Sequence, residues 1–153
     1  MITISLCMIV KNEEDVLDRC LSSVEKAVEE IVIVDTGSVD RTRVIAARHH
    51  ARLVDFPWTD DFAAARNFSF DQATQDFILW LDADDVVPPD QLEKLLALKH
   101  TLNDQCDMVI IRREENGIVS CTAPCQRRCA ARRISRSRGK QNVGRPALSK
   151  PVR

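Results

Sequence analysis

Short, continuous apolar runs recur along the first 111 residues, separated by segments with helical periodicity. The runs are rich in β-branched residues and show little alternation, which is typical of strands covered on both faces in a parallel sheet. They are Ile2–Val10, Ile31–Val34, Leu53–Phe56, Phe77–Leu81 and Met108–Ile111. Strands that alternate with helices in this way predict an α/β fold, a mostly parallel, doubly wound sheet with flanking helices.

The segments between the runs carry the signals of helix ends. The first helix is expected to begin near Asn12, which can cap it, and the second near Asp40. The third is expected at Phe62–Ala73, and a capping box of Asp90 and Glu93 predicts the start of the fourth. Each helix therefore follows a strand.

Charge divides the chain into two parts. All 23 acidic residues lie at or before Glu115, whereas Cys121–Arg153 holds ten of the 22 Lys and Arg residues. The later part is rich in Arg, Cys and Ser and has no apolar periodicity, a pattern typical of weakly ordered chain. We therefore expect one domain at residues 1–116 and a poorly ordered basic tail at 117–153.

No segment of the sequence has the character of a membrane span or a secretory signal. Every apolar run is far shorter than the roughly 20 residues that a spanning helix needs, and no basic stretch precedes the first run. We expect a cytoplasmic protein, with peripheral attachment to a membrane as the alternative. The basic tail lacks the interleaved aromatic residues of a nucleic-acid-binding surface, so no nucleic-acid partner is expected.

Five of the six cysteines fall into two groups. Cys7 and Cys20 fall in an apolar strand and on an apolar helix face, where a reduced cysteine behaves as a small hydrophobic residue. Cys121, Cys125 and Cys129 are spaced by four in the basic tail, but this is no strong zinc spacing and no histidine lies near. Their role stays open.

An acidic cluster, Asp82-Ala83-Asp84-Asp85, follows the fourth apolar run directly. Three carboxylates this close repel one another, and a divalent cation would relieve the repulsion. Mg²⁺ or Mn²⁺ suits this position, because such cations take one or two carboxylates and share their other ligand positions with water and substrate phosphates. The alternative is that Asp82 ends a strand and the other two are solvated loop acids.

Other polar residues near strand ends fit a nucleotide site. Asp35, at the end of the second run, could accept hydrogen bonds from a nucleoside or form a turn. Arg66 could bind a diphosphate or lie on a solvated helix face. Trp58 could stack on a base or sugar, or close over the core. The three histidines have no ligand-like neighbours in the sequence and are expected to be solvated or satisfied.

Taken together, four segments resemble family 2 glycosyltransferases, in particular the SunS-like and lipopolysaccharide-core types. The resemblance covers roughly residues 1–115 and implies the GT-A fold, a Rossmann-like nucleotide-binding sheet. The segments are Met8-Ile9-Val10-Lys11-Asn12-Glu13-Glu14, Ile33-Val34-Asp35-Thr36-Gly37-Ser38-Val39-Asp40, Asp60-Asp61-Phe62-Ala63-Ala64-Ala65-Arg66-Asn67 and Leu79-Trp80-Leu81-Asp82-Ala83-Asp84-Asp85.

The resemblance also implies an activity and roles for individual residues. It implies inverting, metal-assisted transfer of a sugar from a nucleotide-diphosphate sugar, a UDP-sugar above all, to a glycan, lipid or peptide acceptor in cell-envelope glycan synthesis. Nucleotide contacts would come from Val10, Lys11 and Glu13, base contacts from Asp35 and Thr36, the diphosphate contact from Arg66, and the DXD metal pair from Asp82 and Asp84, with Asp84 the more direct ligand.

The sequence departs from the family after Glu115. The family supplies its general base as a carboxylate in the acceptor-binding half, and no Asp or Glu follows Glu115. We therefore expect a truncated chain, and the change to an Arg-rich tail is typical of a shifted reading frame. Two rival functions stay open: a fragment that binds nucleotide-sugar without transferring, and a haloacid-dehalogenase-type phosphatase with Asp82 as nucleophile.

Overall fold

The computed structural model describes residues 1–102, 108–115 and 118–127. Six strands, four α-helices and one 3-10 helix make up this part of the chain. In chain order the elements are β1 (Ile4–Val10), α1 (Leu17–Val24), η1 (Glu25–Ala27), β2 (Glu30–Asp35), α2 (Thr42–Arg48), β3 (Arg52–Asp55), α3 (Phe62–Asp71), β4 (Phe77–Trp80), α4 (Pro89–Thr101), β5 (Met108–Glu115) and β6 (Ile118–Arg127).

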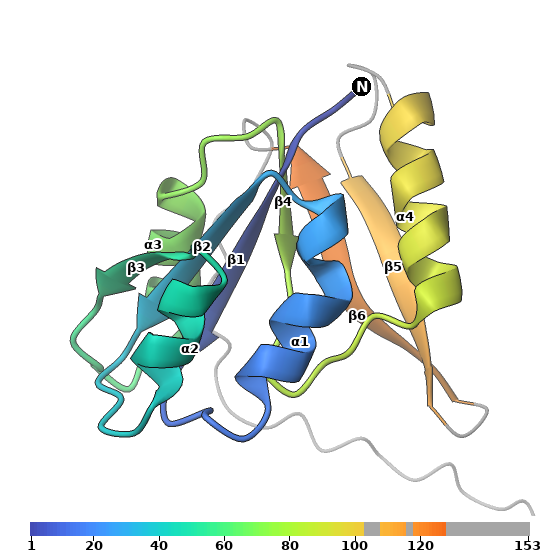
Figure 1. Ribbon diagram of the computed structural model, residues 1–153. Coiled ribbons are helices and arrows are strands. Elements are labelled where there is room, and N and C mark those ends of the chain that lie inside the picture. The colour runs from blue at the N-terminus through green and yellow to red at the C-terminus, as the bar shows by residue number, and fades with distance from the viewer. Residues whose placement is uncertain (103–107, 116–117, 128–153) are drawn as a thin grey trace, which may run out of the picture.

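The six strands form one mixed sheet in the order β3-β2-β1-β4-β6-β5. The first four strands are parallel, whereas β6 runs antiparallel to β4 and to β5. The chain passes from β1 outward to β2 and β3 and then returns to place β4 on the other side of β1 (Figure 1). This reversal between β1 and β4 is the kind of position where open α/β sheets bind ligands.

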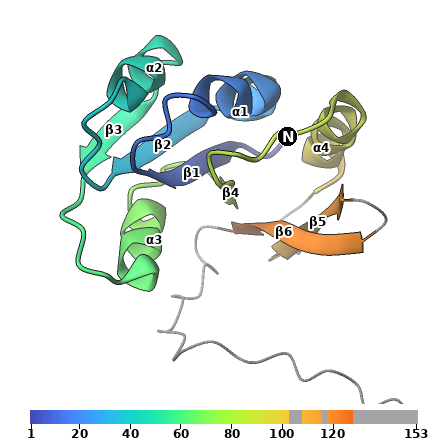
Figure 2. The same ribbon diagram turned by 90° about the horizontal axis from the view of Figure 1, so that it is seen from below.

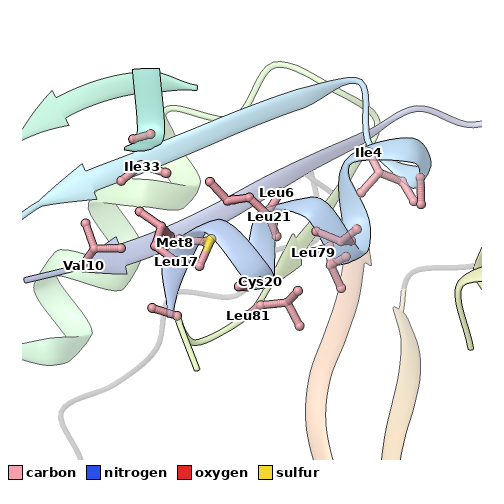
Figure 3. Packing of buried hydrophobic residues seen from close by; sticks show 14 of the residues in the cluster. Ile4, Leu6, Met8, Val10, Leu17, Cys20, Leu21, Ile33, Leu79 and Leu81 are labelled. Carbon is pink, nitrogen blue, oxygen red and sulfur yellow. The ribbon is translucent and has the colours of Figure 1, made fainter. Parts of the chain in front are cut away.

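Helices cover both faces of the sheet, with α1, α2 and α4 on one face and α3 on the other (Figure 2). The larger core cluster joins β1 residues such as Ile4, Leu6 and Met8 to Leu17 and Leu21 of α1, as Figure 3 shows. The smaller cluster lies under α3 and consists of Cys7, Val32, Phe70, Ala73 and Ile78, with Trp80 packed against it. Both faces of β1 are therefore buried, as its continuous apolar run predicts.

The α/β, mostly parallel architecture predicted from the sequence is confirmed, but several local expectations are wrong. Asn12 does not cap α1, because its backbone is left-handed, with φ 56°, and the helix begins five residues later. Asp90 and Glu93 form no capping box; α4 begins at Pro89, where the missing N–H costs nothing. The helix with a side-chain cap is α3, where Asp61 accepts the N–H of Ala64 at 3.1 Å.

The structure also differs from expectation after residue 117. No regular element is predicted there from the sequence, yet β6 spans Ile118–Arg127 and pairs with β4 and β5. Strand pairing supplies the order that local periodicity does not indicate. Residues 128–153 lie outside the described part of the chain. The domain division at residue 117 and the role of Cys129 therefore remain predictions. Within the described part, no helix is long and apolar enough to cross a membrane.

A buried lysine ties α4 to the main body. The side chain of Lys99 is 5% exposed, its Nζ donates to the carbonyl of Ala27 at 2.9 Å, and it also pairs with Glu29. Glu29 in turn accepts the N–H of Ile4 at 2.8 Å. One ion pair thus links the last helix, η1 and the first strand.

Replacing Lys99 with Met is expected to lower the free energy of unfolding by about 2–4 kcal/mol, because a half-buried carboxylate and a buried carbonyl both lose their donor. Lys94 on the same helix offers a matched control, since its pair with Asp90 is exposed and Lys94→Met should change stability by no more than about 0.5 kcal/mol. Urea denaturation of both variants measures the difference. Equal midpoints would contradict the structural role of Lys99.

Candidate functional site

The polar residues singled out in the sequence gather at one edge of the sheet, where the four parallel strands end. Asp35 ends β2 and pairs in register with Val10, the end of β1, and with Asp55, the end of β3. The acidic cluster follows β4 on the other side of β1. The carboxyl edge therefore carries acidic groups on both sides of the point where the strand order reverses (Figure 1).

The acidic cluster forms a tight turn in which its aspartates alternate in exposure. Asp82 and Asp84 are exposed, whereas Ala83 and Asp85 are buried. Asp85 closes the turn: its N–H donates to the Asp82 carbonyl, and its carboxylate accepts the Asp82 N–H, both at 3.1 Å. Below it, the thiol of Cys20 contacts the same carbonyl at 3.6 Å. The turn holds two carboxylates, those of Asp82 and Asp84, free of the core.

Glu13, in the loop after β1, lies within electrostatic reach of these carboxylates. Burial raises the pKa of Glu13, and the charges of Asp84, Asp40 and Asp82 raise it further. The carboxylates thus repel one another beyond the carboxyl ends of β1 and β4, so a cation there would be stabilising. Among the described residues, no group of three or more Asp, Glu, His or Cys side chains could hold a metal ion by itself.

Arg66 points from α3 to the same place. Its Nη2 donates to Oδ1 of Asp82 at 3.1 Å, and its guanidinium carbon lies 5.8 Å from the ring centroid of Trp80. Its Nη1 is buried and has no hydrogen-bond partner in the described part of the structure. A buried donor without an acceptor is costly, so this nitrogen is suited to an anionic ligand.

The loops after β1 and β2 are joined by reciprocal hydrogen bonds. Asn12 donates its N–H to Oγ of Ser38 at 3.0 Å and accepts the N–H of Val39 at 2.9 Å. Glu14 donates its N–H to the Asp40 carboxylate at 3.1 Å, and its own carboxylate accepts the N–H of Arg41 at 2.9 Å. The N–H of Glu13 donates to Oγ1 of Thr42 at 2.7 Å. These bonds explain the left-handed backbone conformation of Asn12, and they fix the two loops against each other.

Asp35 is almost fully buried, with 1% of its side chain exposed. Its Oδ1 accepts the N–H groups of Gly37 and Ser38 at 3.2 and 2.9 Å, and its Oδ2 accepts Nη1 of Arg43 at 2.7 Å. The same nitrogen of Arg43 also pairs with Asp55. Arg43 therefore bridges the ends of β2 and β3 and covers the Asp35 carboxylate.

Two carboxylates at opposite ends of β2 give the fold an acid-sensitive component. Burial opposes the ionisation of Asp35, but hydrogen bonds from Ser38, Arg43 and Gly37 outweigh it and lower the pKa of Asp35. Burial likewise opposes the ionisation of Glu30, and hydrogen bonds from Ser5, Thr74 and Arg52 lower its pKa. A lowered pKa in the folded state means that the folded state holds these protons less tightly than the unfolded chain does.

The contribution of Asp35 and Glu30 to the free energy of unfolding is therefore expected to be constant above about pH 5 and to be lost as the pH drops through about 4, where the unfolded chain binds protons first. Urea midpoints at pH 7, 5 and 3 measure the effect. Glu30→Gln should flatten the acid branch, whereas Glu93→Gln, at an exposed position of α4, should leave it unchanged. An acid branch equally steep in Glu30→Gln would contradict the assignment.

The structure brings the expected residues together in two groups. One group lies beyond the carboxyl ends of β1 and β4 and consists of Asp82, Asp84, Glu13 and Arg66. The other is Asp35, at the end of β2 beside the joined loops. Among the other expected residues, Val10 accepts two hydrogen bonds from Thr36 at 3.0 and 3.1 Å, both of these residues are buried, and Lys11 is exposed.

The remaining cysteine, histidine and tryptophan side chains singled out in the sequence are explained by burial or by local contacts. Cys7 and Cys20 are free and buried, and burial raises the pKa of each thiol to about 12. His49 lies between the carboxylates of Asp18 and Glu25, at 3.0 and 3.1 Å, and is a satisfied histidine as expected. Trp58 donates to Asp60 at 2.8 Å.

The sequence matches a known protein family. The sequence model described as "Glycosyl transferase family 2" matches residues 5–146, which extends past the 115 residues that carry the motifs. A TPR repeat-containing protein of Synechococcus elongatus is 52% identical over 85 residues, covering 56% of this chain and 21% of that protein. Glycosyltransferase SunS of Bacillus subtilis is 32% identical over 108 residues, 65% of this chain and 24% of SunS. The chain spans at most about two fifths of such relatives.

Solved structures agree on the fold. Glucosyl-3-phosphoglycerate synthase from Mycobacterium tuberculosis in complex with UDP superposes with a TM-score of 0.64 at 20% identity, covering 83% of this chain and 57% of that one. The same synthase in complex with Mn²⁺, UDP and phosphoglyceric acid gives a TM-score of 0.50 at 26% identity, covering 57% and 34%. The sheet and its flanking helices are thus those of a GT-A fold.

Proposed function

Because the chain belongs to glycosyl transferase family 2, we propose that it binds a nucleotide-diphosphate sugar at the carboxyl edge of its sheet and transfers the sugar to an acceptor. The observation that carries this proposal is the convergence of Arg66, with a buried donor lacking an acceptor, on the exposed carboxylates beside β4. A cationic donor next to a pair of carboxylates suits a diphosphate held together with a divalent cation.

The carboxylates beside β4 fit a divalent cation of the Mg²⁺ or Mn²⁺ type. Such ions need one or two protein carboxylates when phosphate oxygens and water complete the shell, and Asp84 and Asp82 are both exposed at the turn. Asp82 already pairs with Arg66, so Asp84 is the more direct ligand. When bound, the cation would neutralise charge that grows on the departing nucleoside diphosphate. Burial is the largest cause of the raised pKa of Glu13, and the charges of Asp84, Asp40 and Asp82 add to it, which a cation beside these carboxylates would offset.

The side chains of this chain have separate tasks in the proposed reaction. Arg66 binds and orients the diphosphate, and its burial against Trp80 keeps the guanidinium in place before the ligand arrives. Glu13 and Lys11 border the nucleotide from the rigid loop after β1. Asp35 and Thr36 stand at the nucleoside end, where Asp35 acts through the groups that cover it.

UDP is the nucleotide that we propose for the donor. The solved synthase that shares 26% identity with this chain binds UDP together with Mn²⁺. The proposed acceptor is a glycan, lipid or peptide in cell-envelope glycan synthesis, and the chain would act in the cytoplasm or at a membrane surface. Transfer with inversion needs a carboxylate base near the acceptor.

A second candidate function is donor binding without transfer, because Arg66, Asp82 and Asp84 would all serve the donor. A chain that binds the nucleotide-sugar but lacks the base would hold the donor without transferring from it. The phosphatase alternative is disfavoured, because its nucleophile belongs on the first strand of a sheet, whereas Asp82 follows β4.

Calorimetric titration of the full chain with UDP, with Mn²⁺ and then with EDTA, tests the proposal. We expect Mn²⁺-dependent binding of UDP and of UDP-sugars, followed by release of UDP when acceptor hydroxyls are supplied. Binding without release would establish the second function in place of transfer. Absence of any UDP binding in the presence of Mn²⁺ would overturn both.

A further inference from the structure

Arg43 is the exposed group at the nucleoside end of the candidate site, although no motif marks it. Asp35 is 1% exposed, whereas Arg43 is 43% exposed and lies directly over the Asp35 carboxylate. A ligand that approaches the end of β2 therefore meets the guanidinium before it meets the carboxylate. Arg43 is therefore the more accessible member of the pair.

Two carboxylates hold the guanidinium in one place. Nη1 donates to Asp35 at 2.7 Å and also to Asp55, which is 77% exposed at the end of β3. Within the described part of the chain, both of these hydrogen bonds come from Nη1. Among the described residues, the other N–H groups of the guanidinium make no hydrogen bond, so they can donate to a ligand with little reordering of the side chain.

The distance from the diphosphate end is suitable for a nucleoside. Asp84 follows β4, and β4, β1, β2 and β3 are successive neighbours in the sheet. Strands lie about 4.8 Å apart, so the ends of β2 and β3 are roughly 10–14 Å from the end of β4. A nucleoside diphosphate with its phosphates beside Asp84 and Arg66 would carry its base across β1 toward Arg43.

We propose that Arg43, anchored by Asp35 and Asp55, is a specificity-determining residue that donates hydrogen bonds to a carbonyl oxygen of the nucleobase. The inference rests on the proposed nucleotide-binding function. Arg has donors only, so it favours the O4 carbonyl of uracil over the amino group that cytosine carries at the same position. Asp35 then serves as the buried anchor of the recognition group.

The test compares ligands that include or lack the base. Calorimetric titrations would measure the dissociation constants of UDP, CDP and inorganic pyrophosphate, each with Mn²⁺, for the wild-type chain and for Arg43→Gln and Arg43→Lys. Arg43→Gln is expected to weaken UDP binding about tenfold or more, to reduce the preference for UDP over CDP, and to leave pyrophosphate binding within about twofold.

Arg43→Lys keeps a positive charge beside Asp35, so this variant preserves the fold if Arg43→Gln does not. It should still lose the preference for UDP over CDP, because the fixed planar donors are gone. Unchanged preference in a folded Arg43→Lys chain, or equal loss of UDP and pyrophosphate binding, would overturn the inference. If the wild-type chain binds pyrophosphate and UDP equally, the inference fails while the diphosphate site stands; if it binds neither, the proposed function fails.

Discussion

Asp84→Asn is expected to weaken the Mn²⁺-dependent binding of UDP by about 100-fold or more, while leaving the fold as stable as in the wild type. Asp84 is exposed, and the described part of the chain offers it no hydrogen bond or ion pair, so nothing structural depends on its charge. The amide is a poorer ligand for a hard cation than the carboxylate is. The loss is therefore expected in binding alone.

The stability of the variant gives the prediction a second readout. The charge of Asp84 contributes to the raised pKa of Glu13, so its removal should relieve repulsion and let that pKa fall. Urea denaturation should show a midpoint equal to the wild type or slightly higher. A functional site that trades stability for ligand binding behaves in this way.

Asp90→Asn is the matched control for Asp84→Asn. Asp90 is also exposed, and its carboxylate makes surface contacts with Lys94 at 3.5 Å and with Gln91 at 2.9 Å. Calorimetric titrations with Mn²⁺ and UDP, and with EDTA added, should show no change in this control. Wild-type affinity in Asp84→Asn, or equal losses in both variants, would show that the metal does not bind beside β4.

The acidic turn after β4 shows how far the sequence predicts this site. Because a buried apolar strand must end at an edge of the sheet, the position of Asp82 and Asp84 could be predicted, and the observed alternation of exposure agrees with two carboxylates on one side. The direction in which the Arg66 side chain points could not be predicted, since an Arg on an apolar helix face fits a solvated position equally well. Its partner Asp82 is 16 residues away and meets it only through the packing of α3.

The nucleoside end was harder to predict. Asp35 has the residue type and position of a ligand contact, but its burial depends on Arg43, whose bridge needs the register that pairs Asp35 with Asp55. Asn12 has the residue type of a helix cap, yet two hydrogen bonds to the next loop hold it in a left-handed conformation. Both cases arise because contacts between segments far apart in the sequence, or on neighbouring strands, outweigh local preference.

Arg66→Met is expected to weaken the Mn²⁺-dependent binding of UDP and of pyrophosphate by a similar factor, about 30-fold or more. Both ligands present a diphosphate, and the variant removes the buried Nη1 that lacks an acceptor as well as the charge. Arg43→Gln, in contrast, should affect UDP alone. The ratio of the two affinities therefore separates a diphosphate contact from a base contact.

Stability should change little in Arg66→Met. The pair with Asp82 is largely exposed on the Asp82 side and contributes little, the contact with Trp80 is worth about 0.5–1 kcal/mol, and a methionine can fill the same apolar space. Arg48→Met, on the exposed surface of α2, is the control for loss of an arginine charge and should bind both ligands normally. Normal pyrophosphate binding by Arg66→Met would show that the unpartnered nitrogen serves the packing of α3 rather than the ligand.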